Sequence, residues 1–271
     1  MSLLGRLYEL WRYQELIYNL VVRDLKVRYK NSILGVGWSL LNPLLMMVVF
    51  TIVFKYLAGQ SAYPAFPAFI LCALLPWNFF QDSVAGATAT IVGNAHLIKK
   101  VYFPREVLPI ALVLSNLVNF LIALPVYFVL ATLMGRPPTL WALLLPLVIL
   151  VQVAFTIGMA FILSTLNVFY RDTHLILGVV LLAWFFLTPV FYPINQVPEQ
   201  RVILGVAVPL RVWLRRLNPM ASIIASYRDI LYWGARPGLD FFLRTAVTAF
   251  LTLLIGYLIF HHYSPRFAEE V

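Results

Sequence analysis

Six long apolar stretches constrain this chain more than any other feature of its sequence. Each holds 18 to 30 mostly apolar residues, and an α-helix needs about 20 to cross the hydrocarbon layer of a membrane. The stretches are residues 34–57, 66–92, 107–134, 140–169, 175–192 and 241–263. Hydrocarbon offers no water to backbone amides, so each stretch must satisfy its own hydrogen bonds as a helix. The sequence predicts an all-α integral membrane protein with six transmembrane helices.

Composition excludes a water-soluble fold. Hydrophobic residues make up 62% of the chain and charged residues only 11%, against about 25% charged in a typical soluble domain. The charges lie in short intervals, so we expect residues 1–271 to form a single membrane domain. The net charge of +9 does not indicate nucleic-acid binding, because many of the basic residues flank apolar runs, as in proteins held against anionic headgroups. The lone Cys72 excludes an intramolecular disulfide.

The distribution of Lys and Arg between the stretches predicts the orientation. The segment before the first stretch carries six basic residues and no continuous apolar core of a cleavable signal, and the second connection contains Lys99, Lys100 and Arg105. The first connection, 58–65, has none, and the third has only Arg136. Basic connections stay on the cytoplasmic side, so we expect both termini in the cytoplasm.

The first 32 residues are expected to form an amphipathic helix in the cytoplasmic interface. Its apolar face is Leu7, Trp11, Tyr18, Val22, Leu25 and Tyr29. Its other face is Gly5, Glu9, Arg12, Asn19, Arg23, Lys26 and Lys30. Such a helix is either a membrane anchor only or, in addition, the border of a substrate entrance.

The segment between the fifth and sixth stretches departs from the charge rule, because it would be external and yet contains six arginines. They are Arg201, Arg211, Arg215, Arg216, Arg228 and Arg236. The apolar run 202–214 is too short to span, and Asn218 can cap a helix that has Pro219 at its first position. We expect two short re-entrant or interfacial helices within 194–233.

Catalytic and metal-binding patterns are absent from the sequence. It has no G-x-x-x-x-G-K-[ST] phosphate loop, no H-E-x-x-H, no C-x-x-C and no G-x-S-x-G. His261 and His262 are adjacent, so on a helix they point in different directions and form no ligand pair. We assign no catalytic, metal or cofactor site to this chain. If ATP drives the protein, another chain must bind it.

Polar and aromatic side chains inside the stretches leave two interpretations each. Asp82 is an ionisable group within the second stretch. It marks a polar pathway, or else it bonds a neighbouring helix or lies near an end of the span. The aromatic residues form either an interfacial belt or the lining of a sugar channel, because sugar C–H faces pack on ring faces. The candidate channel aromatics are Trp38, Trp77, Phe80, Trp184, Phe191 and Tyr192.

Several passages together resemble the ABC transporter permeases that export O-antigen, teichoic acid and related polysaccharides. The first passages are RDLKVRYK at 23–30, NSILG at 31–35 and WSLLNPL at 38–44, followed by LIKKVYFPR at 97–105. The others are YRD at 170–172, TPVFYP at 188–193, NP at 218–219 and YR at 227–228. They occur in the expected order over nearly the whole chain, although residues 200–217 match least distinctly.

The resemblance implies a homodimer of six-helix subunits in the bacterial inner membrane. Each subunit would pair with a separate cytoplasmic ATPase, two copies in all, which would bind ATP and Mg. The substrate would be a polyprenyl-pyrophosphate-linked polysaccharide. The basic stretch 94–105 would be the coupling helix that receives the ATP-driven motion, with Asn94, His96, Lys99, Lys100 and Arg105 at the contact. An ordinary positively charged loop is the alternative for that stretch.

The transport hypothesis assigns further residues. Arg23, Lys26, Arg28 and Lys30 would recruit the phosphates at the cytoplasmic face. At the outer face the helices within 194–233 would close the path, and Arg211, Arg215 and Arg216 would contact either the phosphates or lipid headgroups. Two other functions compete. A membrane glycosyltransferase or ligase would need clustered acids, and an ion-coupled transporter would show paired intramembrane carboxylates, whereas the spans contribute essentially Asp82 alone.

Overall fold

Long apolar helices dominate the protein, which we describe from a computed structural model. It describes residues 11–30, 32, 35, 37–57, 63–192, 194, 197–199, 201–203 and 206–271, with the backbone alone at 57, 201–203, 206–208, 210 and 215. Within these residues, five helical segments are long and apolar enough to cross a membrane. They are Gly37–Tyr56, Phe66–Gly93, Val107–Leu133, Leu140–Phe169 and Leu239–Glu270. The prediction of a helical membrane protein is therefore confirmed.

The helix α8 (Thr173–Leu187) is shorter than the fifth predicted span. Its 15 residues would measure about 22 Å at the rise of an α-helix, below the roughly 30 Å of a hydrocarbon layer. The helix ends at Thr188, whose backbone is extended (φ −97°, ψ 133°). The following residue is Pro189, and a proline disfavours the helical conformation in the residue before it. This effect of Pro189 on Thr188 ends the helix five residues before the end of the predicted span.

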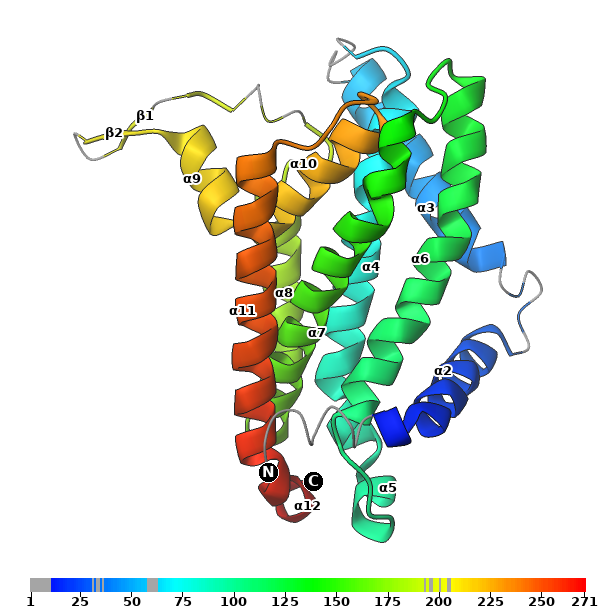
Figure 1. Ribbon diagram of the computed structural model, residues 1–271, viewed down its shortest axis with the longest axis vertical. Helices are drawn as coiled ribbons and strands as arrows, with labels where there is room; N and C mark the ends of the chain where they lie inside the picture. Colours follow the sequence, from blue (N-terminus) through cyan, green and yellow to red (C-terminus); the bar gives the residue numbers. More distant parts are fainter. Residues whose placement is uncertain are drawn as a thin grey trace.

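The helix α4 (Phe66–Gly93) forms the centre of the bundle. In its most apolar window 78% of the residues are buried, against 11% for Gly37–Tyr56 and 17% for Leu239–Glu270. The first of these two segments comprises α3 (Gly37–Phe50) and most of a π-helical continuation at Thr51–Leu57. Figure 1 shows α3 and α11 (Leu239–Tyr263) on opposite sides of the bundle. Both outer helices present apolar side chains to the surroundings.

The most extensive contact between two helices joins α7 (Leu145–Phe169) to α11. A 3-10 turn at Leu140–Leu144 leads directly into α7. Gly158 and Gly256 lie at the crossing. A Cβ built on Gly158 would stand 2.6 Å from the carbonyl oxygen of Thr252, and one on Gly256 would overlap the carbonyl oxygen of Gly158. Only glycine permits this approach, as at other helix crossings in membranes.

One end of the molecule carries the short elements α5 (Ala95–Lys100) and α12 (Phe267–Glu270), the latter reached through a 3-10 turn at Ser264–Arg266 (Figure 1). The helix α2 (Gln14–Tyr29) lies obliquely near the same end and packs against α6 (Val107–Leu133). Of its predicted apolar face, Leu7 lies outside the described residues. Trp11 and Tyr18 are exposed, whereas Tyr29 is half-buried.

The opposite end carries α9 (Leu210–Leu217) and α10 (Pro219–Leu231), the two short helices expected there. They are preceded by an antiparallel hairpin of β1 (Arg201–Ile203) and β2 (Val206–Val208), which the sequence analysis did not predict. Figure 1 shows the hairpin projecting from the bundle. The hairpin lies in the first half of the apolar run 202–214. Val and Ile residues there have high strand propensity, which explains the difference.

Candidate functional site

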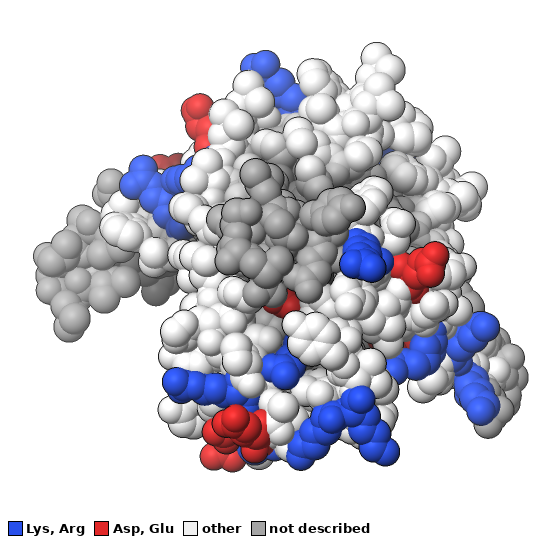
Figure 2. Space-filling view, turned by 60° about the horizontal axis from the view of Figure 1, so that its bottom comes forward, with Lys and Arg blue, Asp and Glu red and all other residues white. Residues whose placement is uncertain are grey.

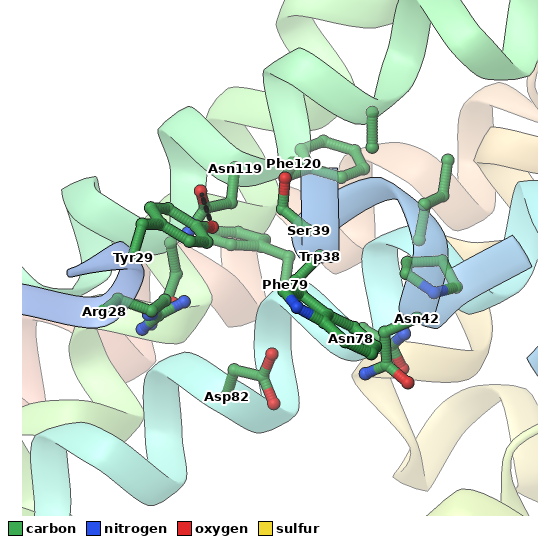
Figure 3. A pocket seen from close by; sticks show the side chains of 14 residues that line it. Arg28, Tyr29, Trp38, Ser39, Asn42, Asn78, Phe79, Asp82, Asn119 and Phe120 are labelled. Atoms are coloured by element: carbon green, nitrogen blue, oxygen red, sulfur yellow. Dashed lines mark hydrogen bonds between the residues drawn. The ribbon is translucent and has the colours of Figure 1, made fainter. Parts of the chain in front are cut away.

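A polar cleft opens between the end of α2 and the helices α3, α4 and α6 (Figure 3). Its volume is about 240 Å³. It combines one cation, one carboxylate and four asparagines with four aromatic side chains. These residues are Arg28, Asp82, Asn42, Asn78, Asn116, Asn119, Tyr29, Trp38, Phe79 and Phe120. Polar and ionisable side chains are rare between the helices of an apolar bundle, so their concentration in one cleft indicates a functional site.

Two asparagines of α6 have unsatisfied amide atoms in the cleft wall. Asn116 is 3% exposed, and neither its amide nitrogen nor its amide oxygen has a hydrogen-bond partner within the described residues. The Asn119 oxygen accepts a hydrogen bond of 2.7 Å from the Tyr29 hydroxyl, while its nitrogen is unpartnered in the same part of the chain. A buried polar group without a partner costs about 1–3 kcal/mol. These amides therefore favour a polar occupant of the cleft.

Asp82 lies in this cleft and is exposed to it. Figure 3 shows its carboxylate below Asn119, on the helix α4. Arg28 is the cation whose field acts on this carboxylate. The two form no ion pair within hydrogen-bonding distance in the described structure, so both groups remain available to a ligand. Asp82 therefore faces a polar cavity rather than bonding a neighbouring helix.

A second, more open groove runs between α2 and α6, with a volume of about 910 Å³. Arg23, Lys26 and Lys30 line it together with the aliphatic residues Val22, Leu25, Val27, Val118 and Ile122. Arg23 is paired with Asp24 at 3.0 Å. Tyr29 and Asn119 line both cavities, so their hydrogen bond belongs to the wall between the groove and the cleft. Three of the predicted recruitment residues line the groove, and Arg28 lines the cleft.

The stretch predicted to couple to an ATPase forms a short amphipathic helix at the end of the molecule. Ile98 is buried and holds α5 against the bundle, while His96, Lys99 and Lys100 are exposed. The side-chain amide of Asn94 donates to the carbonyl of Thr90 at 2.8 Å. Figure 2 brings this end forward and shows basic side chains spread around it. The helix therefore presents a positively charged face.

A hollow of about 610 Å³ adjoins α5 and is lined by Lys99, Lys100, Arg105, Glu106 and His261 among others. Partial burial lowers the pKa of Arg105, while the neighbouring Glu106 acts in the opposite direction. Glu106 is 4% exposed and lies 3.5 Å from Nδ1 of His261. Phe267 of α12 is completely buried beside these groups and stacks edge-on with Phe260. The end of the chain thus packs with α5 into one surface.

At the opposite end, Asn218 caps α10 as predicted. Its side-chain oxygen accepts from the backbone N–H of Ala221 at 3.2 Å and from Nε1 of Trp184 at 2.8 Å. Its amide nitrogen donates to the hydroxyl of Thr188 at 2.8 Å. Gln152 of α7 adds a buried link, because it donates to the carbonyl of Pro76 and accepts from the hydroxyl of Tyr227. The helix α10 is therefore tied to several spans.

The predicted external arginines differ in their surroundings. Arg211 pairs with the carboxylate of Glu199 at 2.9 Å and donates to the carbonyl of Val197 at 3.0 and 3.2 Å. Arg216 is exposed. Arg215 belongs to α9, and its side chain lies outside the described part. A role for all three in binding phosphate stays a prediction.

The six predicted channel aromatics also differ in exposure. Trp77 and Phe80 are buried in the interior of the chain, at 1% and 0% exposed. Trp184 packs edge-on against Phe80 at 5.1 Å between ring centroids. Trp38 is 47% exposed beside the polar cleft. Phe191 and Tyr192 are half-buried near the end of α8, where Phe191 stacks on Phe54 at 4.4 Å.

Arg228 has a role that the sequence analysis did not identify. It is 5% exposed and donates to the carbonyls of Pro189 at 2.6 Å, Tyr192 at 3.3 Å and Val190. Its guanidinium lies 3.9 Å from the ring centroid of Phe69. One signal was present in the sequence, because Arg228 lies within the apolar periodicity of residues 223–231, where a charge needs internal partners.

Comparison with known proteins places this helical membrane chain in a class of transporters. The profile of the ABC-2 type transporter family matches residues 15–232. The chain belongs to the ABC-2 type transporter family, which confirms the resemblance seen in the sequence motifs and the prediction of a transporter permease rather than an enzyme.

Individual relatives are permeases of export systems. The chain is 37% identical to the O-antigen export system permease protein RfbA of Myxococcus xanthus, over 97% of this chain and 98% of that protein. It is 34% identical to the protein of the same name from Klebsiella pneumoniae, over 97% of both chains. It is 21% identical to the polysialic acid transport protein KpsM of Escherichia coli, over 79% of this chain and 80% of that protein.

Proposed function

We propose that this chain is the membrane subunit of an ATP-driven exporter that moves polyprenyl-pyrophosphate-linked polysaccharide, such as O-antigen, out of the cytoplasm. The observation that carries the proposal is the similarity to O-antigen export permeases over 97% of the chain. The substrate has a charged head, and an ion crosses hydrocarbon unaided only at a prohibitive cost. A protein-lined path with a site for the phosphates is therefore required.

The groove between α2 and α6 supports the recruitment step. Lys26 and Lys30 supply positive charge for a pyrophosphate, and the aliphatic residues beside them suit the isoprenoid chain. In this proposal α2 borders the substrate entrance in addition to anchoring the chain. The glycan then passes between two copies of the chain along exposed rings such as Trp38, and α9 and α10 close the path at the outer end.

We infer a homodimer in the bacterial inner membrane with both termini in the cytoplasm. Support comes from the exposed apolar side chains of α3 and α8, among them Val49 (56%) and Val179 (70%), which need lipid or a second copy as cover. The six-span topology assigns α8, together with residues 188–192, to the fifth crossing. An odd number of crossings would put the termini on opposite sides, whereas α2 and α12 lie near the same end of the bundle.

The energy source in this proposal is a pair of cytoplasmic ATPase subunits that bind ATP and Mg. The exposed basic face of α5, which includes Lys99 and Lys100, supports a docking role, because a short amphipathic helix fits a groove of a partner. Co-purification of the chain with a co-expressed candidate ATPase subunit from the same organism tests this directly. The double substitution Lys99→Glu and Lys100→Glu should weaken the association about tenfold or more, since opposing like charges cost several kcal/mol.

Arg236→Glu is the matched control, because Arg236 is also an exposed cation but lies in the loop from α10 to α11. Figure 1 shows α10 and the start of α11 at the end of the bundle opposite α5. It should leave the ATPase bound. Thermal unfolding of each purified permease distinguishes a lost contact from a lost fold. Unchanged ATPase association and glycan export in a folded double variant would contradict the assignment of α5. Turnover of a sugar donor by the chain alone would contradict the transporter proposal.

A further inference from the structure

The two cavities on either side of the Tyr29–Asn119 hydrogen bond have opposite chemistry. The groove carries three cations and aliphatic residues. The cleft carries four asparagines, one carboxylate, one cation and four aromatic side chains. Because Tyr29 and Asn119 line both cavities, a single elongated ligand can reach from one into the other. Such a ligand has an anionic, apolar part and a neutral, polar part.

The cleft matches the hydrogen-bonding pattern of a sugar. Each hydroxyl of a sugar both donates and accepts, and an asparagine amide offers two donors and an acceptor. Asn116 and Asn119 hold buried, unpartnered amide atoms in the cleft wall, and the exposed carboxylate of Asp82 can accept hydrogen bonds from further hydroxyls. Trp38, which is 47% exposed beside the cleft, provides apolar ring surface for C–H faces. All the requirements of carbohydrate recognition therefore meet in one cavity.

Other occupants fit the cleft less well. The carboxylate of Asp82 would repel a phosphate group in the cleft, and an isoprenoid chain there would leave the amide of Asn116 without a partner. The described residues contain no group of three His, Cys, Asp or Glu that could hold a metal ion. The cleft volume of about 240 Å³ leaves room for one sugar ring.

We propose that the cleft binds the sugar residue joined directly to the pyrophosphate, while the groove holds the phosphates and the first isoprene units. This inference rests on the proposed export of a lipid-linked glycan and assigns its first recognition step. In the structure the Tyr29 hydroxyl donates a hydrogen bond of 2.7 Å to the side-chain oxygen of Asn119. A sugar hydroxyl takes the place of Tyr29 when the ligand enters. The chain thereby distinguishes a loaded lipid carrier from a bare one.

The test compares two defined lipids on the complete permease–ATPase complex in nanodiscs. One is undecaprenyl pyrophosphate, and the other is the same lipid carrying a single N-acetylglucosamine. The wild-type complex should bind the sugar-bearing lipid about tenfold or more tightly than the bare lipid, because two or three net hydrogen bonds are worth that ratio. Equal affinities for the two lipids in the wild type would overturn the proposal.

Substitutions in the cleft test whether the cleft is the part of the protein that distinguishes the two lipids. Asn116→Leu and Asp82→Leu should bring the ratio of the two affinities close to one and leave the affinity for the bare lipid unchanged. Asn167→Leu is the matched control, since Asn167 is also a buried intramembrane asparagine with an unpartnered oxygen but lies outside the cleft. It should keep the wild-type ratio.

The affinity for the bare lipid reports folding in each variant, because only a folded groove binds it. A ratio that stays at the wild-type value in both cleft variants overturns the assignment of the cleft. Failure of the wild-type complex to bind either lipid instead contradicts the proposed export function itself. The two failures are therefore distinguishable in one experiment.

Discussion

At the scale of single residues, Arg228 is a buried cation at the end of the bundle that carries α9 and α10. A buried cation is costly unless its donors are bonded. The two terminal nitrogens of Arg228 donate to the backbone carbonyls of Pro189, Val190 and Tyr192, while its Nε has no hydrogen-bond partner among the described residues. Those carbonyls follow the end of α8, where the chain leaves the helix and its own acceptors lose their helical donors. Arg228 therefore joins α10 to the turn after α8.

Replacing Arg228 with Met should destabilise the protein. The substitution keeps an apolar stem of similar length but leaves three carbonyls without their donor, at about 1–3 kcal/mol for each that stays buried. We expect the midpoint of thermal unfolding in detergent to fall by at least about 5 °C. Arg236→Met, at an exposed position in the following loop, is the control and should change the midpoint little. Equal midpoints for both variants would contradict this role.

At the scale of elements, the crossing of α7 and α11 depends on two glycines. The backbone of Thr252 and Leu253 approaches the position that a Cβ of Gly158 would occupy. A neighbouring backbone cannot rotate away as a flexible side chain can, so any larger residue must push the two helices apart. Since α11 is otherwise a peripheral helix with 17% of its most apolar window buried, this crossing contributes much of its attachment.

Gly158→Ala should therefore destabilise the protein by about 1–3 kcal/mol, the usual cost of overpacking. Gly178→Ala in α8 is the matched control, because nothing lies within 4 Å of its added Cβ. That substitution should stabilise its helix by roughly 0.5–1 kcal/mol. Opposite shifts of the thermal midpoint are the expected result. A stabilising effect of Gly158→Ala would show that the two helices do not approach so closely.

At the scale of the whole molecule, the two ends differ in character. One end carries α5, α12 and the start of α6, with basic side chains around them. The other carries α9, α10 and the start of Leu140–Leu144. The proposed orientation puts the first end in the cytoplasm. The only cysteine, Cys72, is completely buried in α4, so the native chain should give little background in labelling experiments.

Single introduced cysteines test this orientation. Tyr102→Cys replaces a residue 90% exposed beside α5, and Leu140→Cys replaces one 85% exposed at the opposite end. In intact spheroplasts, a membrane-impermeant maleimide should label Leu140→Cys and leave Tyr102→Cys unlabelled until the membrane is permeabilised. Labelling of the wild-type chain would contradict the burial of Cys72. The reverse pattern for the two variants would contradict the orientation.

The sequence by itself determined the features that depend on neighbours along the chain. The lengths of the apolar stretches predicted the five long helices, and the Asn218–Pro219 pair predicted the start of α10. The shortening of α8 was readable in principle, because Pro189 acts on the residue directly before it. The family was also predictable from the sequence, since the short motifs and their order identify it without a structure.

Only the tertiary structure decided which polar groups meet. Arg28, Asp82 and Asn119 lie on three different helices, and no local pattern states that they share a cleft. The partners of Arg228 and the burial of Trp77 are likewise set by packing between distant segments. The physical reason is that membrane helices are alike in apolar length. Small residues, hydrogen bonds and shape then select their neighbours, and these act across the bundle rather than along the chain.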